Sequence, residues 1–350
     1  MAMRCYLSLP LMLFVGLRAL AQDSPAQVHD QVADIVNAHH VTGLSAAYFE
    51  GGQIVHTVAI GLDSAGGTQP VTSQTVFSAA SLSKPVLAYI VWQLADEGIL
   101  ELDDPVHKHV DYPDLRHDAR ATTVTIRQLL THHGGLPNWR EGDTLRFKQD
   151  PGVGFSYSGE GYVWLQRMLE HLTGREYATL ARERVFEPLG MTRSSMVFEE
   201  RFQDDYAVPH NDHRHSKAMH RWSKANAAAS LQTTAPDFAR FLIALIKRTD
   251  MLEQHLPVEL AMWNDAPAPE PNTVGWVPGL GFQRGDRGTQ YWHWGHNNGF
   301  RAYFTVAPAE DRGLVFFTND SNGLDLVPEL TDYAELGEQP GWRWAGYAPE

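Results

Sequence analysis

Hydrophobic and polar positions follow a strand-like pattern near both ends of the chain. Two apolar runs of strand length, 44–50 and 53–60, flank Gly51-Gly52, a pair that accepts the positive φ of a two-residue hairpin turn. Towards the other end, three further runs are separated by short polar turns, at 291–294, 301–306 and 314–318. These runs predict a hairpin and an antiparallel meander.

Between these strands, apolar residues recur at helical spacing. Four helices are predicted, at about 87–94 with a stop at Gly98, 162–172 with a stop at Gly174, 177–186 before Pro188, and 234–245 with Thr234 and Asp237 as its cap. Strands at both ends with helices between them predict an α+β fold. In that fold the N- and C-terminal strands form one antiparallel sheet flanked by helices, a mainly helical subdomain is inserted at about 100–230, and a cleft lies at the seam.

The chain has 350 residues, 43% of them hydrophobic, and we expect one large domain, or two interlocked ones, over 22–350. Residues 1–21 resemble a signal peptide, with an apolar run from Tyr6 to Leu17 and a small-x-small site at Ala19-Leu20-Ala21. Cleavage after Ala21 would give a secreted or periplasmic product without stable membrane insertion. Arg18, between the apolar run and the cleavage site, is atypical of a signal peptide. An uncleaved N-terminal anchor is therefore the alternative. The stretch 267–278 is interpreted as a surface loop.

Cysteine content and charge exclude several function classes. The single cysteine, Cys5, lies in the predicted signal, so the mature chain would have no disulfide, cysteine-ligated metal or cysteine nucleophile. Loss of Arg4 and Arg18, in a segment without acids, would take the formal charge from −14 to −16. Such an acidic protein repels phosphate backbones, so we expect no nucleic-acid partner.

The first chemistry-bearing motif is Ser81-Leu82-Ser83-Lys84. A serine hydroxyl needs a base within reach, and residues three apart lie on one helical face, so Lys84 can reach Ser81. Proline is tolerated in the first helical turn, so Pro85 predicts a helix that begins near Ser81. Ser83 lies about 100° away from Lys84 around the helix, which makes it the poorer candidate.

Longer blocks around this motif resemble the class C β-lactamase-related serine hydrolases, a family that includes penicillin-binding proteins and esterases. The matching blocks are 76–84, 102–106, 125–137, 151–158 and 186–191, in family order, and the resemblance covers about residues 30–325. It implies a β-lactamase/transpeptidase-like fold and acyl transfer to Ser81.

The second family motif, Tyr-x-Asn, is Tyr157-Ser158-Gly159 in this sequence. The resemblance implies that Tyr157 shuttles the serine proton while the charge of Lys84 keeps the pKa of Tyr157 low. The family asparagine contacts a substrate amide, and its replacement by Gly159 disfavours efficient β-lactam turnover. Glu160 is a candidate substitute for it.

The third family motif, Lys/His-x-Gly, is His293-Trp294-Gly295, followed by His296. The resemblance makes His293 the basic wall of the cleft and the backbone N–H of His296 an oxyanion donor beside that of Ser81. Gly295 would let a substrate backbone approach the strand. Trp294 replaces a small residue, and either it narrows the cleft or it points to the other face of the strand.

Other residues are open to two interpretations. The histidines of one polar run are candidate zinc ligands, although solvated loop histidines are the simpler interpretation: His210, His213, His215 and His220. Three tryptophans beside matched blocks line either an acyl pocket or the core: Trp139, Trp222 and Trp292. The run 341–344 is expected to pack against the domain without chemistry.

Together these observations predict a secreted serine hydrolase without cofactor or metal, acting through an acyl-enzyme on Ser81. Its expected substrates are small carboxylic esters or D-amino-acid-type peptides and amides. The alternatives are a β-lactamase or penicillin-binding D,D-peptidase, a catalytically impaired module that binds β-lactams or peptidoglycan, and, last, a zinc hydrolase. The oligomeric state is left open.

Overall fold

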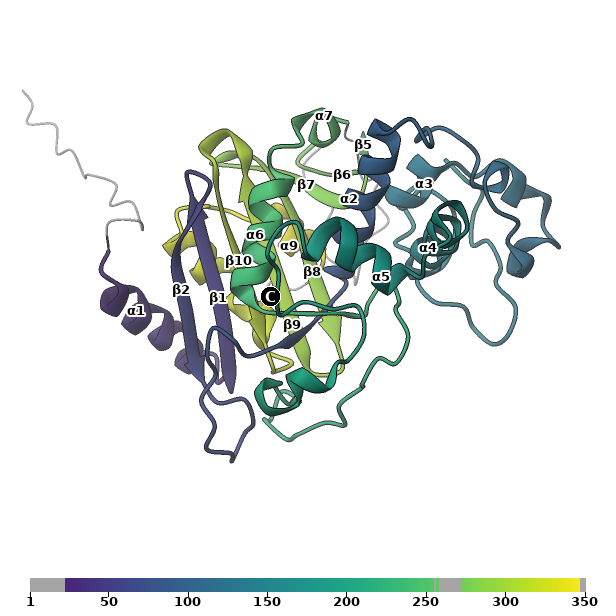
Figure 1. Ribbon diagram of the computed structural model, residues 1–350. Helices are drawn as coiled ribbons and strands as arrows, with labels where there is room; N and C mark the ends of the chain where they lie inside the picture. Colours follow the sequence, from purple (N-terminus) through teal and green to yellow (C-terminus); the bar gives the residue numbers. More distant parts are fainter. Residues whose placement is uncertain (1–22, 255, 258–271, 347–350) are drawn as a thin grey trace, which may run out of the picture.

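The computed structural model describes residues 23–254, 256–257 and 272–346 (Figure 1). The predicted signal peptide and residues 267–271 of the predicted surface loop lie outside these ranges. The main sheet is antiparallel, has eight strands in the order β2-β1-β10-β9-β8-β7-β6-β5, and consists of β1 Gly43–Glu50, β2 Gln53–Gly61, β5 Leu256–Pro257, β6 Val274–Val277, β7 Leu280–Gly285, β8 Gly288–Asn297, β9 Phe300–Ala307 and β10 Arg312–Thr318.

The sheet joins the two ends of the chain, as the sequence predicts. Strand β1 pairs with β2 on one side and with β10 on the other, so the N-terminal hairpin extends the C-terminal meander. Gly51 and Gly52 form the predicted turn with φ of 59° and 71°. The interpretation of 267–278 as a surface loop is wrong over Val274–Val277, which is the buried strand β6.

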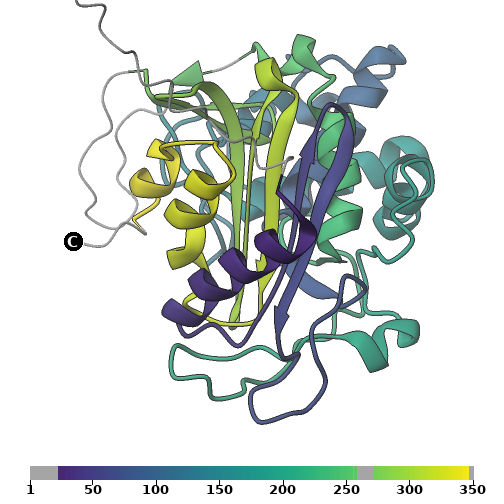
Figure 2. The same ribbon diagram turned by 90° about the vertical axis from the view of Figure 1, so that its left-hand side faces the viewer.

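Helices cover both faces of the sheet, so it lies between two layers (Figures 1 and 2). Figure 2 shows α1, α8 and α9 on one face, with α2 and α6 on the other. The helices are α1 Pro25–Ala38, α2 Ser83–Asp96, α3 Ile126–Leu130, α4 Gly159–Thr173, α5 Tyr177–Ala181, α6 Ala235–Leu245, α7 Thr249–Leu252, α8 Val327–Tyr333 and α9 Pro340–Trp344.

The four helices predicted from apolar spacing are confirmed. They are α2, α4, α6, and α5 with the π-helical turn Arg182–Phe186 that continues it. Helix α4 begins where the Ser158 hydroxyl accepts the Gly161 N–H at 2.8 Å and ends at Gly174, whose φ is 64°. The C-terminal α9 buries Trp342 and Trp344, which confirms its role in packing.

A second, two-stranded sheet of β3 Phe77–Ala80 and β4 Leu231–Thr233 lies at the seam between the main sheet and the mainly helical part of the chain. Strand β3 contacts both β8 and β9, and α2 follows β3 directly. Among the described residues, no helix is both long enough and apolar enough to span a bilayer.

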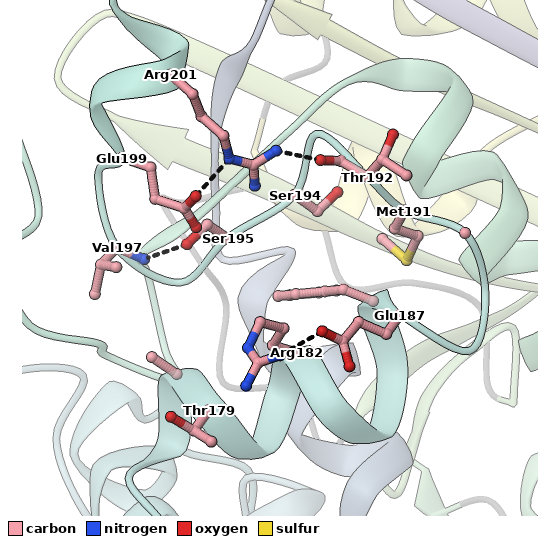
Figure 3. A pocket seen from close by; sticks show the side chains of 13 residues that line it. Thr179, Arg182, Glu187, Met191, Thr192, Ser194, Ser195, Val197, Glu199 and Arg201 are labelled. Carbon is pink, nitrogen blue, oxygen red and sulfur yellow. Dashed lines mark hydrogen bonds and ion pairs between the residues drawn. The ribbon is translucent and has the colours of Figure 1, made fainter.

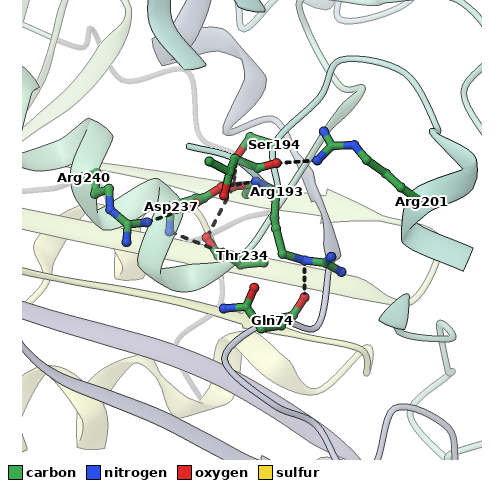
Figure 4. A network of polar contacts seen from close by, with 9 residues as sticks. Gln74, Arg193, Ser194, Arg201, Thr234, Asp237 and Arg240 are labelled. Carbon is green, nitrogen blue, oxygen red and sulfur yellow. Dashed lines mark hydrogen bonds and ion pairs between the residues drawn. The ribbon is translucent and has the colours of Figure 1, made fainter. Parts of the chain in front are cut away.

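A buried polar network holds β4 and the start of α6 in place (Figure 4). The Asp237 carboxylate accepts hydrogen bonds from the Arg193 backbone N–H at 2.7 Å, the Ser194 hydroxyl at 3.0 Å and the Arg240 guanidinium at 2.7 Å. The Ser194 hydroxyl also lies 2.7 Å from that of Thr233 in β4. Because β4 pairs with β3, this network supports the strand that leads to Ser81.

Candidate active site

Ser81 lies in a turn between β3 and α2. Ala80, directly before it, has a left-handed φ of 51°, which turns the chain sharply out of the strand. Such a conformation is costly for a residue with a Cβ and is typical of functional sites. Helix α2 begins at Ser83, two residues later than Ser81, and the Lys84 N–H donates to the Ser81 carbonyl at 3.0 Å.

The Ser81 and Lys84 side chains meet as their spacing predicts. The Lys84 ammonium nitrogen Nζ lies 3.0 Å from Ser81 Oγ and donates a second hydrogen bond to the Ala228 carbonyl at 2.8 Å. The Lys84 side chain is fully buried, whereas Ser81 is partly exposed. Burial lowers the pKa of Lys84 well below its ordinary value, because the charged form loses its hydration. This favours a neutral amine able to accept a proton.

Ser83 has a structural role instead. Its fully buried hydroxyl donates to the Ala80 carbonyl at 2.6 Å and accepts the Leu231 N–H at 2.8 Å. These two contacts tie the start of α2 to β3 and β4, and they direct Ser83 away from the position that Ser81 occupies beside Lys84.

Tyr157 also lies beside Lys84. The Lys84 Nζ atom is 4.8 Å from the centroid of the Tyr157 ring, and the ring itself is buried in an aromatic cluster. Its neighbours include Trp294 at 5.1 Å and His293 at 6.2 Å between ring centroids. The structure therefore brings Tyr157 to Ser81 and Lys84 from a second, distant segment of the chain.

The position of the family asparagine is closed by other residues. A Cβ atom at Gly159 would lie 2.8 Å from the Trp139 ring and 2.9 Å from the Asn138 carbonyl oxygen. Asn138 accepts the Gly159 N–H and so caps α4. Glu160 does not substitute for the asparagine, because its buried carboxylate forms a two-pronged ion pair with Arg140 at 2.7 and 3.0 Å.

His293 differs from its expected role as a basic wall. Its side chain is fully buried, and its Nδ1–H donates to the Trp294 carbonyl at 2.7 Å. Burial lowers the pKa of His293 to about 3, and nearby Lys84 adds to the shift. At neutral pH His293 is therefore an uncharged imidazole and provides no cation for a substrate carboxylate.

Gly295 brings β8 close to the nucleophile turn. A Cβ atom there would lie 2.4 Å from the Ala79 carbonyl oxygen and 3.2 Å from the Ala80 Cβ. The space that this glycine frees is taken by the chain's own β3, and not by a substrate as the sequence suggested. Trp294 does not narrow a cleft, since it is buried and stacks on Trp292 at 5.5 Å.

His296 lies near the end of β8, next to the last residue of the strand. The pairing of β7 with β8 stops at Gly281 and Trp292, whereas β9 pairs with β8 beyond His296. His296 is exposed. The next residue, Asn297, was not singled out from the sequence, and its amide donates to the Ser78 hydroxyl and the Ala229 carbonyl, both at 3.1 Å.

A cavity of about 350 Å³ opens beside this end of β8. One lining residue, Asn297, connects it to the Lys84 environment, because the Asn297 amide bonds Ala229, and Lys84 bonds the neighbouring Ala228. The lining is Ser78, Pro209, Ala218, His220, Trp222, Asn297, Asn298 and Phe300. Of the three tryptophans considered from the sequence, Trp222 lines this cavity, Trp139 is 45% exposed and Trp292 is core.

The histidine run does not form a metal site in the structure. His210 is fully buried, with Nδ1 donating to the Asn319 carbonyl and Nε2 accepting the Ala65 N–H, both at 2.9 Å. His213 and His215 are exposed. In the part of the chain that the structure describes, no three His, Cys, Asp or Glu side chains are grouped so as to hold a metal ion.

A separate cavity of about 490 Å³ lies between α5 with its π-helical turn and the segment 191–201 (Figure 3). Arg182 and Arg201 line it, and each forms an ion pair with a neighbouring carboxylate, Glu187 and Glu199. The linings of both cavities lack Ser81, Lys84 and Tyr157, so the contact between Ser81 and Lys84 is what directs us to the seam around Ser81.

Comparisons with known proteins agree with this geometry. The Beta-lactamase family profile matches residues 27–339. Penicillin-binding protein 4 of Amycolatopsis lactamdurans is 35% identical over 188 residues, or 49% of each chain. Protein flp of Staphylococcus aureus (strain MW2) is 22% identical over 90% of this chain and 66% of its own length. The matches thus span about half and about two thirds of these relatives.

Solved structures share the fold at low sequence identity. A class C beta-lactamase superposes with a TM-score of 0.75 at 19% identity, covering 92% of this chain and 99% of that one. The octameric penicillin-binding protein homologue from Pyrococcus abyssi gives a TM-score of 0.73 at 22% identity, covering 90% and 78%. The predicted α+β architecture is therefore confirmed.

Proposed function

Since the chain belongs to the beta-lactamase family of serine hydrolases, we propose that it is an enzyme that acylates Ser81 and releases the acyl group to water. The observation that carries this proposal is the 3.0 Å contact between Ser81 Oγ and the buried Nζ of Lys84. A serine becomes a nucleophile when an adjacent base takes its proton, and a neutral lysine amine is such a base.

The proposed acyl transfer needs two proton movements. As Ser81 Oγ bonds to the substrate carbonyl carbon, its proton moves to Lys84 Nζ, and the backbone N–H groups of Ser81 and His296 face the developing oxyanion. The leaving alkoxide or amine then takes a proton, which Tyr157 delivers from Lys84. Water adds to the acyl group in the reverse sense, which frees the carboxylic acid and restores the Ser81 hydroxyl.

The site favours esters over β-lactams for two reasons. A β-lactamase holds both an amide and a carboxylate of its substrate. At the position of the amide-binding asparagine this chain has Gly159 beneath Trp139, and in place of a permanent cation it has the neutral His293. An ester requires neither contact. The cavity beside Asn297, with Trp222 and Phe300 in its lining, is a fitting acyl pocket for an apolar group.

Penicillin binding with slow release is the second candidate. It is supported by the name of the relative that is 35% identical, Penicillin-binding protein 4, and by the complete set of Ser81, Lys84 and Tyr157. Acylation would proceed as for an ester, and poor contacts at Gly159 and His293 would limit turnover. We also propose, from the N-terminal sequence, that the protein acts outside the cytoplasm on small esters, or on D-amino-acid peptides and amides.

Steady-state kinetics on esters and β-lactams test the proposed preference for esters. We expect a higher kcat/KM for short aryl esters than for a chromogenic cephalosporin, because one missing buried hydrogen bond alone costs about 5- to 150-fold. Gly159→Asn combined with Trp139→Ala, which removes the ring contact at residue 159 and leaves the Asn138 carbonyl oxygen as the remaining close neighbour, should narrow the gap, with Trp139→Ala alone as the control. A wild-type protein that hydrolyses the cephalosporin faster than every ester would refute the preference.

A further inference from the structure

His132 is a buried side chain that the proposed acyl transfer leaves unused. It is 1% exposed and lies in the block 125–137, directly after α3. Its φ is 60°, a left-handed conformation that is unfavourable for a residue with a Cβ. Backbone strain of this kind persists only where the surrounding structure imposes it. The contacts of His132 with its neighbours must therefore hold it in this conformation.

The contacts of His132 lead to Tyr157. Its Nδ1 accepts the backbone N–H of Ser158 at 3.0 Å, and Ser158 directly follows Tyr157. The His132 and Tyr157 ring centroids are 4.3 Å apart, closer than Tyr157 lies to Trp294 or His293. In addition, the Ser156 N–H donates to the His132 carbonyl at 2.7 Å. His132 therefore holds the backbone on both sides of Tyr157 and one face of its ring.

These contacts fix the tautomer of His132. Since Nδ1 accepts a hydrogen bond, the ring proton is on Nε2, and within the described residues Nε2 has no hydrogen-bond partner. Burial lowers the pKa of His132 well below its ordinary value, and the nearby Lys84 and His293 lower it further. Protonation at Nδ1 would also break the bond to Ser158.

We propose that His132 is a positioning residue that holds Tyr157 in register with Lys84 and Ser81 by accepting the Ser158 N–H. The inference rests on the proposed function, because it matters only if Tyr157 carries a proton during acyl transfer. A displaced phenol would slow proton delivery while leaving the acyl pocket beside Asn297 unchanged. The effect is therefore expected in kcat and in the rate of Ser81 acylation, and not in KM.

Two substitutions of His132 distinguish the contribution of its hydrogen-bond acceptor, Nδ1, from that of its aromatic ring. His132→Phe keeps an aromatic ring but has no acceptor, whereas His132→Asn places an amide oxygen near the position of Nδ1 and tolerates a left-handed φ. We expect His132→Phe to lower kcat for an aryl ester about 10- to 100-fold with KM changed less than about threefold. His132→Asn should recover most of that loss. His133→Asn, one residue further, is the matched control.

The rate of covalent labelling by a fluorophosphonate probe is measured on the same variants. A folded His132→Phe protein with wild-type kcat and labelling rate would overturn the inference, as would equal losses in His132→Phe and His132→Asn. If His132→Phe does not fold, His132→Ala replaces it, and Asn must still exceed Ala about tenfold. Tyr157→Phe separates the two proposals: full activity in Tyr157→Phe contradicts the proton-carrying role itself, whereas loss there with no loss in His132→Phe contradicts only this inference.

Discussion

Two basic side chains in the site, Lys84 and His293, are buried so deeply that both favour their neutral forms. For Lys84 this supplies a lone pair next to Ser81 Oγ. For His293 it removes the positive charge that the family motif would bring to the cleft. Burial therefore has opposite consequences at the two residues, since it creates a base at one and eliminates an anion contact at the other.

The pKa of His293 makes stability depend on pH. In the unfolded chain a histidine binds a proton below about pH 6.5, whereas the folded protein does not protonate His293 until about pH 3. The free energy of unfolding therefore falls as pH drops from about 6.5 towards 3, by about 1.4 kcal/mol per pH unit for this group, and is unaffected by it above about pH 6.5.

We expect His293→Gln to flatten this acid-side loss, because glutamine does not titrate. Urea unfolding at several pH values between 4 and 7 measures the difference, with the exposed His213→Gln as the control. Parallel curves for His293→Gln and the wild type would show that His293 is not held neutral by the fold.

The sequence was sufficient to pair Ser81 with Lys84, because residues three apart at the start of a helix lie on the same face and their side chains can meet. It was not sufficient for Gly159, whose lost side-chain space is filled by Trp139 from a distant loop. Nor did it reveal that Gly295 faces Ala79, since a glycine in a strand is equally compatible with a substrate or with a neighbouring strand. Contacts between remote segments decided both cases.

At the level of elements, the strands at both ends and helices α2, α4, α5 and α6 were predictable from periodicity alone, whereas the 14-residue helix α1 was missed. Strands β6 and β7 were missed, because glycines interrupt their apolar pattern. Gly281 is one of these, and a Cβ there would lie 2.7 Å from the Trp292 indole, so the close approach of β7 to β8 requires glycine. Gly281, which the packing against Trp292 requires, thus interrupts the apolar pattern from which a strand would be predicted.

The Asp237 network offers a test of how elements support the site. Asp237→Ala leaves the Arg193 N–H without its acceptor and the Ser194 hydroxyl with only the Thr233 hydroxyl as partner, which should lower the free energy of unfolding by about 1–3 kcal/mol. Chemical denaturation measures this, with the exposed Asp204→Ala as the control. Should Asp237→Ala unfold at the wild-type denaturant concentration, the network in Figure 4 does not stabilise the start of α6.

In the whole molecule, the site forms where the sheet meets the mainly helical part of the chain. Ser81 and Lys84 come from the β3–α2 connection, Tyr157 from the segment before α4, and His293 to His296 from β8. Layers of helices on both faces of the sheet keep these segments in place (Figures 1 and 2). Folding is therefore required to assemble the site, because no single segment contains all of its groups.

The central claim is that Ser81, activated by Lys84, forms a covalent acyl intermediate. Intact mass spectrometry after reaction with a fluorophosphonate tests it most directly, with peptide mapping of the adduct. We predict one adduct per chain at Ser81 in the wild type, an adduct retained in Ser83→Ala, and none in Ser81→Ala or, at matched time, in Lys84→Ala. An adduct that persists in folded Ser81→Ala, or that maps to another serine in the wild type, would contradict the account.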